Sequence, residues 1–391
     1  MSATTHDQPN GAAVPTHPYD VIVAGVGGMG SAACYQLARR GSRVLGIERH
    51  GIPHPHGSSH GLTRIIRLAY HESPAYVPLV RRAMMLWLET GDRFGEPLLF
   101  TTGSLDLGPG GGAFFSGSLA ACREHDLTHE VLTAHEINHR FPAFRVPHDH
   151  AGLLQPNGGF VASERAIVAH AEMAKAAGAG IHTQESVLDW TPIAGGGVQV
   201  RTDCGTYDAG RLIVSAGAWL GDLVPALAPV AVAERQVLGW FEPQAPAHFL
   251  PDRMPVTILM VDEGPYFALP IWGAPGVKIG LHHHRFERGR AGDLQRDPDA
   301  DDEALLRVCL HYMPDADGPL VRMASCLYTN TPDEHFIIDT LPGNEDVIVA
   351  SPCSGHGYKF ASVIGEILAD MAIGARPRFD LSMFSLARFA G

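Results

Sequence analysis

The sequence predicts an α/β fold with two domains: a Rossmann-like domain and a second domain on a mixed, largely antiparallel sheet. The chain of 391 residues exceeds the size at which a single hydrophobic core usually suffices. Near its start, a glycine-rich turn lies between a buried strand and a helix. Between about residues 230 and 322, apolar and polar residues alternate in several pieces, as in the strands of a sheet.

The composition excludes several classes of protein. Hydrophobic residues make up 45% of the chain and charged residues 18%, with 44 Gly and 29 Pro, which is typical of a compact, loop-rich enzyme. The net charge of -13 disfavours the positive surface that nucleic acids and anionic membranes require. No apolar run approaches the roughly 20 residues that span a bilayer, and the polar start lacks an export signal. We therefore expect a cytoplasmic protein that binds neither nucleic acid nor a membrane.

The first structural unit is a strand, a turn, a helix and a second strand. Residues 19–24 form a buried strand because β-branched residues cluster immediately before the turn at 25–30. Residues 31–40 carry Ala, Leu and Cys at helical spacing, and Gly41 ends this helix. The second strand covers residues 43–48.

This unit carries a dinucleotide-binding fingerprint. In the pattern Gly25-x-Gly27-x-x-Gly30, the glycines permit a tight turn and let a pyrophosphate approach the backbone and the helix N-terminus. Glu48 ends the second strand, where a carboxylate accepts hydrogen bonds from ribose hydroxyls. Because Glu48 would repel a ribose 2'-phosphate, the motif disfavours NADP, but it does not separate FAD from NAD.

The remaining patterns alternate between the two predicted domains. The basic, histidine-rich segment 53–67 is expected to be a long loop of the kind that is usually functional. Helices are expected at 77–89, 114–125, 134–140, 163–177 and 360–373 and near 305, and strands at 99–108, 152–159, 198–214, 336–338 and 347–350. The predicted nucleotide-binding domain covers residues 19–98, 152–230 and 325–391, the substrate domain covers 99–151 and 231–324, and residues 1–18 form a flexible tail.

Four further segments resemble the family of monomeric sarcosine oxidase and N-methyl-L-tryptophan oxidase, which are D-amino-acid-oxidase-like FAD oxidoreductases. They are the loop 60–70, the Lys-x-Gly-x-His pattern of 278–282, the segment 326–339, and the segment 354–370 with its Ser-Gly-His-Gly start. Together with the glycine turn they follow the family order and spacing across almost all of residues 19–390. The resemblance implies an FAD-binding domain in which the cofactor lies extended beneath the substrate domain.

The resemblance also implies residues that hold the cofactor. Cys326 matches a cysteine that forms a thioether with the flavin 8-methyl group, and a thiolate is the nucleophile that this bond requires. Gly355, Gly357 and Lys359 belong to the family's C-terminal block and are expected to contact FAD. Without the resemblance, Cys326 would be interpreted as an inert core cysteine, as we interpret Cys353.

Two cations and two aromatic residues are expected to bind the substrate. Arg67 and Lys359 match carboxylate ligands, and a guanidinium paired with an ammonium group can clamp a carboxylate in a partly dry pocket. Tyr328 and Phe267 align with aromatic positions near the substrate. Phe267 replaces the tyrosine expected there, so the size and polarity of the substrate stay open.

Four further residues are expected to take part in catalysis. Lys278 matches a lysine whose positive charge favours electron transfer to oxygen. His282 matches a histidine close to the substrate amine, where a neutral imidazole accepts a hydrogen bond. Arg64 and His60 match residues that set the electrostatics of the flavin pocket. Two more histidines follow His282, but consecutive strand residues point to opposite faces, so we predict no metal site.

The resemblance and these residues together imply an oxidase that removes a hydride equivalent from the carbon beside a secondary amine. Oxygen is reduced to hydrogen peroxide, and hydrolysis of the imine releases formaldehyde and the primary amino acid. Sarcosine is the leading substrate, with N-methyl-L-tryptophan and cyclic imino acids such as proline as alternatives. Two alternatives from other functional classes stay open. The protein could be an NAD-dependent dehydrogenase, or a flavoprotein that passes its electrons to another acceptor. By resemblance, the protein is expected to be a monomer.

Overall fold

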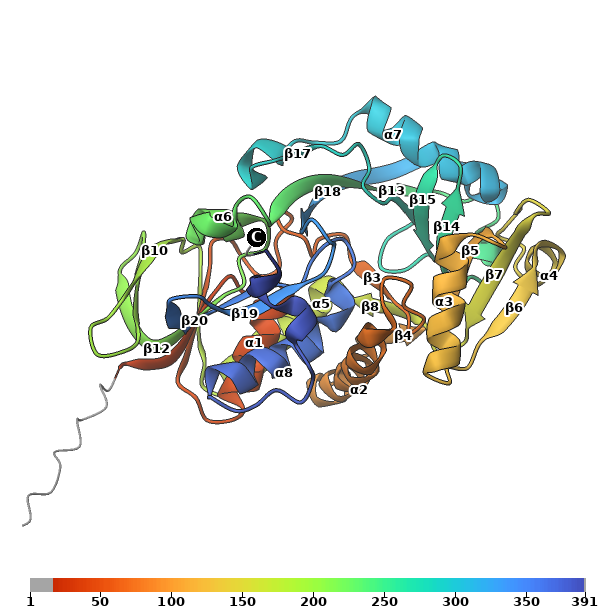
Figure 1. Ribbon diagram of the computed structural model, residues 1–391. Coiled ribbons are helices and arrows are strands. Elements are labelled where there is room, and N and C mark those ends of the chain that lie inside the picture. The colour runs from red at the N-terminus through yellow and green to blue at the C-terminus, as the bar shows by residue number, and fades with distance from the viewer. Residues whose placement is uncertain (1–16, 390–391) are drawn as a thin grey trace, which may run out of the picture.

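The computed structural model describes residues 17–389, so nearly all of the predicted tail, residues 1–18, lies outside the described residues. Two large β-sheets and one small sheet form the framework, and helices cover their outer faces. Figure 1 shows α1 and α8 beside the first large sheet at one end of the molecule and α3 and α4 beside the second at the other end. The predicted α/β class with a mixed, largely antiparallel second sheet is confirmed.

The first large sheet has eight strands. They are β1 (Tyr19–Ala24), β2 (Val44–Glu48), β9 (Gly180–Thr183), β10 (Val187–Pro192), β11 (Val198–Thr202), β12 (Thr206–Val214), β19 (Ile337–Leu341) and β20 (Asn344–Ser351). β9, β2, β1, β12 and β20 are parallel neighbours in that order. Val21 and Val23 of β1 pack into one hydrophobic core and Ile22 and Ala24 into another, so both faces are buried. Burial on both faces explains the unbroken apolar run of this strand.

Four helices pack beside this sheet. They are α1 (Gly28–Ala38), α2 (Val77–Phe94), α5 (Ser163–Ala176) and α8 (Ala361–Ala372). α1 contacts both α5 and α8. It approaches α8 closely because Gly365 has no side chain, and a Cβ there would lie 2.5 Å from Ala32. This packing fixes the N-terminus of α1 at the end of β1.

The second large sheet has nine strands. They are β5 (Ser104–Pro109), β6 (Glu130–Thr133), β7 (His150–Gln155), β13 (Val232–Phe241), β14 (Val256–Val261), β15 (Gly264–Leu269), β16 (Val277–Leu281), β17 (Arg288–Gly289) and β18 (Leu320–Asn330). Within the described chain, every pairing in this sheet is antiparallel except that of β5 with β14. β13 pairs with β18 along almost its whole length, and in Figure 1 the two strands lie below β17 and α7 in the upper part of the molecule.

Smaller elements complete the two halves. The helices α3 (Ala113–Glu124), α4 (Ala134–Arg140) and α7 (Ala300–Arg307) pack on the nine-stranded sheet, and the short α6 (Leu220–Leu223) contacts β10. A three-stranded antiparallel sheet joins β3 (Thr63–Ile66), β8 (Gly159–Ala162) and β4 (Leu99–Thr101). β3 carries the predicted site residue Arg64, and Arg67 directly follows its last residue, Ile66.

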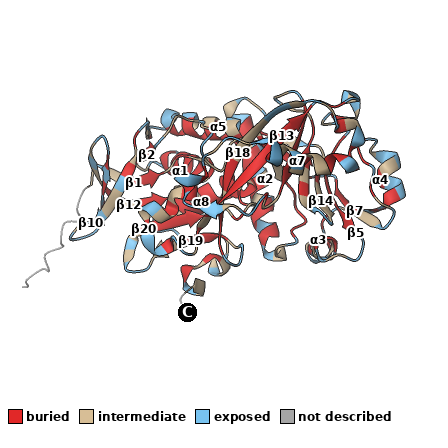
Figure 2. Ribbon diagram, turned by 90° about the horizontal axis from the view of Figure 1, so that it is seen from above, coloured by how far each residue is buried: buried red, intermediate tan, exposed pale blue. Residues whose placement is uncertain are grey.

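Buried residues concentrate along the central strands and helices, whereas α4 and the outer loops are largely exposed (Figure 2). No helix within residues 17–389 combines the length and the apolar character needed to cross a membrane.

Several predicted boundaries are wrong. The predicted helix 31–40 begins earlier, at Gly28, because the glycine turn itself supplies the first helical turn. The predicted helix 77–89 continues to Phe94, since its buried face extends through Trp87 to Gly91, and it ends at Gly95, which has φ +80°. The division into domains stays a prediction, and its boundaries at 152 and 325 fall within β7 and β18.

Candidate active site

A continuous cavity of about 480 Å³ extends from the carboxyl ends of β1 and β2 to the inner face of the nine-stranded sheet. The glycine turn, the loop 49–59, β3, β13, β15, β16, β18 and the loop before α8 all contribute to its lining. The carboxyl edge of a parallel sheet is where α/β proteins usually bind ligands. Both large sheets therefore contribute to one candidate site.

The glycine turn is shaped for a dinucleotide. Gly25 has φ +92°, and a Cβ on Gly30 would overlap the carbonyl oxygen of Gly25, so these glycines let α1 pack onto the turn. A Cβ on Gly27 would instead meet no atom within 4 Å, which leaves open space beside the backbone. No side chain caps the N-terminus of α1, so its N–H groups can serve an anionic ligand. The turn fits the pyrophosphate of a dinucleotide.

Glu48 lies at the end of β2 and lines the same part of the cavity. Its two carboxylate oxygens accept hydrogen bonds from the backbone N–H groups of Val26, at 2.9 Å, and His50, at 3.0 Å. Burial raises the pKa of Glu48, and these two bonds act against that effect. The backbone thus orients Glu48 beside the glycine turn, where the fingerprint places the ribose-binding acid.

The loop that contains His60 and Arg64 is held from two sides. Glu164, at the start of α5, accepts hydrogen bonds from His60 Nδ1 at 2.9 Å and from the N–H of Gly61 at 2.8 Å. Arg64 folds back and donates to the carbonyl oxygens of Ser58, at 2.7 Å, and His60, at 2.6 Å. Arg64 lines the cavity, whereas His60 bonds to Glu164 and does not line it. Burial raises the pKa of Glu164, but the hydrogen bonds outweigh this effect and lower the pKa to about 2.

Lys278 of β16 is buried against the same loop. Its Nζ donates to the carbonyl oxygens of Gly61, at 3.1 Å, and Thr63, at 2.6 Å, and to the Thr63 hydroxyl at 2.5 Å. Burial and the neighbouring charge of Arg64 hold the pKa of Lys278 well below its usual range. Three oxygen acceptors nevertheless match the three hydrogens of an ammonium group. The loop therefore compensates the cost of burying this cation.

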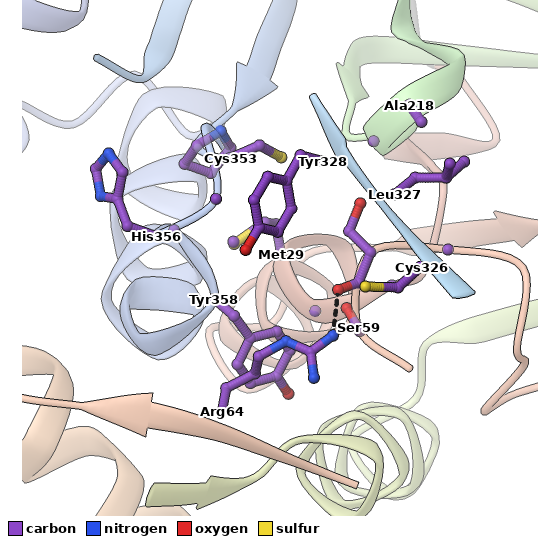
Figure 3. A pocket seen from close by; sticks show the side chains of 18 of the residues that line it. Met29, Ser59, Arg64, Ala218, Cys326, Leu327, Tyr328, Cys353, His356 and Tyr358 are labelled. Carbon is purple, nitrogen blue, oxygen red and sulfur yellow. Dashed lines mark hydrogen bonds between the residues drawn. The ribbon is translucent and has the colours of Figure 1, made fainter. Parts of the chain in front are cut away.

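β18 carries Cys326 and Tyr328 on one face, because residues two apart on a strand point to the same side. Figure 3 shows both side chains among those that line the pocket, together with Arg64. Burial raises the pKa of Cys326, and the charges of Arg64 and Lys278 oppose this effect. The Tyr328 hydroxyl lies 3.2 Å from His282 Nδ1. Burial lowers the pKa of His282 to about 3, so its imidazole is neutral at pH 7.

Glycines bring the other walls close to these residues. Phe267 of β15 pairs with Gly280 of β16, and its ring fills the space that a side chain on Gly280 would need. Gly355 has φ +74°, and a Cβ there would overlap His282 and lie 2.7 Å from the Tyr328 ring. A Cβ on Gly357 would overlap the backbone of the same loop.

Arg67 and Lys359 both line the cavity and lie close to the same tyrosine, Tyr70. Both are buried, and both approach the Tyr70 ring, with the guanidinium carbon 4.9 Å and Lys359 Nζ 5.1 Å from its centroid. Lys359 Nζ donates to the Tyr70 hydroxyl at 3.1 Å and to the carbonyl oxygen of His356 at 2.7 Å. Burial and the charge of Arg67 lower the pKa of Lys359 to about 7.

Glu72 is a functional candidate that the sequence analysis missed. Arg67 donates to both of its carboxylate oxygens, at 3.1 and 3.2 Å, and a second carboxylate, Asp106, lies 3.8 Å from the guanidinium. Burial raises the pKa of Glu72, but the charge of Arg67 outweighs this effect and holds the pKa well below its usual range. A ligand carboxylate that binds Arg67 must therefore compete with Glu72. An acid five residues after a predicted carboxylate-binding arginine was the signal that could have found it.

The predicted site residues thus separate into two groups. The cavity is lined by Gly25, Gly27, Glu48, Arg64, Arg67, Phe267, Lys278, His282, Cys326, Tyr328, Gly355, Gly357 and Lys359. Gly30 and His60 do not line it. Gly30 lies in the first turn of α1 and packs against Gly25, and His60 faces Glu164.

The histidine triplet does not converge. His282 bonds to Tyr328, His283 Nδ1 to Glu234 at 2.7 Å, and His284 Nε2 to Asp302 at 3.0 Å. Within the described chain, no three His, Cys, Asp or Glu side chains are grouped to hold a metal ion.

Comparisons with known proteins agree with this geometry. Residues 20–371 match the model of the FAD dependent oxidoreductase family. The chain is 40% identical over 386 residues to monomeric sarcosine oxidase of Bacillus sp. (strain B-0618), which covers 95% of this chain and 96% of the relative. It is 38% identical over 381 residues to N-methyl-L-tryptophan oxidase of Salmonella agona (strain SL483), covering 95% and 99%. Among solved structures, NikD, an amino acid oxidase essential for nikkomycin biosynthesis, superposes with a TM-score of 0.82 at 28% identity, covering 95% of this chain and 98% of NikD.

Proposed function

Because the chain belongs to the FAD dependent oxidoreductase family, we propose that it oxidises a secondary amino acid of the N-methyl class and passes the electrons to oxygen. Sarcosine is the leading substrate, and N-methyl-L-tryptophan is the second candidate, because relatives with these two activities are almost equally similar to the chain. The products are an imine, which water hydrolyses to formaldehyde and the primary amino acid, and hydrogen peroxide. The NAD-dependent alternative shares the glycine fingerprint, but the family match favours FAD.

One observation supports this substrate class most directly. Two buried cations, Arg67 and Lys359, lie in the same cavity as the dinucleotide turn and the neutral His282. A carboxylate held by Arg67 and Lys359 forms charge-assisted hydrogen bonds in a largely dry site. The cations fix the acid end of an amino acid, and the imidazole can accept a hydrogen bond from its amine.

Bound FAD supplies the two-electron acceptor, and the side chains supply the rest of the chemistry. Displacement of Glu72 by the substrate carboxylate would exchange one ion pair with Arg67 for another, so the cation stays compensated throughout. Lys278 would provide the positive charge that favours electron transfer to oxygen. Phe267 and Tyr328 would pack against the methylated amine, and the glycines 355 and 357 let their loop approach the cofactor.

We further propose that Cys326 holds FAD covalently. The buried thiol requires deprotonation before it can attack, and the charges of Arg64 and Lys278 favour the thiolate. Cys353 also lines the cavity, but no cation lowers the pKa of its thiol, which burial raises. By similarity to proteins named monomeric sarcosine oxidase, the protein is proposed to be a monomer. A cytoplasmic location stays a prediction from the sequence.

The visible spectrum of the purified protein tests cofactor and substrate together. Flavin colour should stay in the pellet after acid precipitation of the wild type and of the matched control Cys353→Ser, and leave the pellet in Cys326→Ser. Anaerobic addition of sarcosine, N-methyl-L-tryptophan or L-proline should bleach the flavin with the true substrate class. Colour that leaves the wild-type pellet would overturn the covalent bond, and a flavin that none of the three bleaches would overturn the substrate class.

A further inference from the structure

Lys359 is connected to the rim of the cavity by a chain of hydrogen bonds. Its Nζ donates to the Tyr70 hydroxyl at 3.1 Å, and this hydroxyl lies 2.7 Å from Nδ1 of His356. Nε2 of the same ring lies 3.0 Å from the carbonyl oxygen of Glu334. Three side chains and one carbonyl group thus follow one another without a gap.

All of these hydrogen bonds point the same way. A carbonyl oxygen can only accept, so Nε2 of His356 carries a hydrogen and Nδ1 of the neutral ring is an acceptor. The Tyr70 hydroxyl therefore donates to Nδ1 and leaves its oxygen free to accept from the Lys359 ammonium group. The direction runs from Lys359 through Tyr70 to His356 and outward.

The two ends of the chain differ in exposure. Tyr70 is completely buried and Lys359 is 6% exposed, whereas the bond from His356 to Glu334 lies at the exposed rim. Figure 3 shows the His356 ring turned away from Tyr328, on the loop before α8. Lys359 therefore has little direct contact with water, but it has a hydrogen-bonded connection to the surface.

We propose that Lys359, Tyr70 and His356 form a proton relay that lets the carboxylate site exchange a proton with solvent. The relay rests on the proposed function in one respect, namely that Lys359 binds the carboxylate of the ligand.

The transfer balances without any further reactant. An N–H bond of Lys359 breaks as an O–H bond forms on Tyr70, whose original proton forms an N–H bond at His356 Nδ1. The imidazolium ion then loses its Nε2 proton to water. A proton that enters at Nε2 later drives the same bonds in reverse, so the relay resets without rotation of the ring.

The charges around the relay suit this task. Lys359 faces Arg67, Glu72 and Asp106, and with its pKa lowered to about 7 it changes charge near neutral pH. His356 faces Glu72, Arg67 and Lys359, and burial lowers its pKa to about 4, so it passes a proton on rather than storing it. A further titratable side chain packed on the Tyr70 ring is Tyr76, whose hydroxyl bonds to His335 at 3.1 Å.

Ligand binding above pH 7 should therefore take up a proton. A carboxylate beside Lys359 stabilises the ammonium form, so the neutral amine that prevails at pH 8 must be protonated as the ligand binds. Acetate is a suitable probe for the holoenzyme, because it has a carboxylate but no amine to oxidise. Its binding is followed by the flavin absorbance, and proton uptake by an indicator dye in weak buffer, in a stopped-flow instrument.

In the wild type at pH 8, proton uptake should keep pace with acetate binding. Tyr70→Phe removes the central hydroxyl at almost constant shape and should slow the uptake about 100-fold while one proton is still taken up in the end. His356→Ala should behave in the same way, and imidazole added to the solution should restore the rate. Tyr76→Phe is the matched control, since it removes a neighbouring hydroxyl outside the relay, and it should keep the wild-type rate.

Each other outcome would overturn the relay. Wild-type uptake rates in Tyr70→Phe, equal slowing in Tyr76→Phe, no rescue of His356→Ala by imidazole, or no proton uptake by the wild type would do so. If acetate failed to bind, Lys359 would not be part of a carboxylate site, and the relay would have no ligand to serve. A protein that oxidises no N-methyl amino acid but takes up a proton with acetate would refute the proposed substrate and leave the relay standing.

Discussion

Two alanine substitutions in the glycine turn should separate packing from cofactor binding. A Cβ on Gly30 would overlap the carbonyl oxygen of Gly25 and lie 2.7 Å from Oγ of Ser215. Overpacking of this kind costs up to about 3 kcal/mol. Gly27 has φ -75° and ψ -153°, which an alanine adopts without strain, and a Cβ there meets nothing within 4 Å. Gly27→Ala should therefore cost no more than about 1 kcal/mol, the loss expected at a helix N-cap.

The assay is thermal unfolding of protein produced without flavin, so that cofactor binding does not contribute to the Tm. With an unfolding entropy of about 2.1 cal/mol/K per residue, the chain has about 0.8 kcal/mol/K in total. Gly30→Ala should then lower the Tm by about 4 °C and Gly27→Ala by about 1 °C. After growth with riboflavin, Gly27→Ala should contain little flavin although its Tm hardly changes, because the new methyl group would occupy the space beside the pyrophosphate. A Gly27→Ala protein with full flavin content, or a Gly30→Ala protein with an unchanged Tm, would refute this assignment.

Three further substitutions test the rest of the site. Lys278→Met should slow the reoxidation of the flavin by oxygen about 100-fold and its reduction by substrate much less, as rapid mixing would show; normal reoxidation would remove Lys278 from the oxygen site. Arg67→Ala should raise KM about 10- to 100-fold with a smaller change in kcat, and equal effects on both would argue against a binding role. Glu164 has its folded pKa lowered from 4.5 to about 2, so its stabilisation is complete above pH 4.5 and lost as the pH falls toward 2. Glu164→Gln should accordingly reduce the free energy of unfolding by about 2 kcal/mol at pH 6 and hardly at all at pH 2, measured in urea; a difference independent of pH would contradict the ionised carboxylate.

Local pattern was sufficient for the elements that depend on near neighbours. The unit from β1 to β2 could be predicted because the glycine spacing, the apolar strand and the helix period all lie within 30 residues of chain. The short helix α4 (Ala134–Arg140) was predicted with its correct ends, since Thr133 and Glu136 form a capping box that is local in sequence. The helix α2 was predicted too short, because its C-terminal half is held by tertiary contacts such as the hydrogen bond from Trp87 Nε1 to the carbonyl oxygen of Lys359.

The sequence by itself determined the nucleotide-binding start, the α/β class and, through the resemblance, most of the predicted site residues that line the cavity, although Gly30 and His60 do not line it and Glu72 was missed. The tertiary structure alone decided which charges face one another. Arg67 is paired with Glu72, the loop around His60 is held by Glu164, and Lys359 reaches the rim through Tyr70 and His356. Most of these partners lie on different elements, and even Glu72, five residues from Arg67, is brought to it by the path of an irregular loop. Hydrogen bonds and ion pairs depend on distances of a few ångströms, and only the tertiary fold sets those distances.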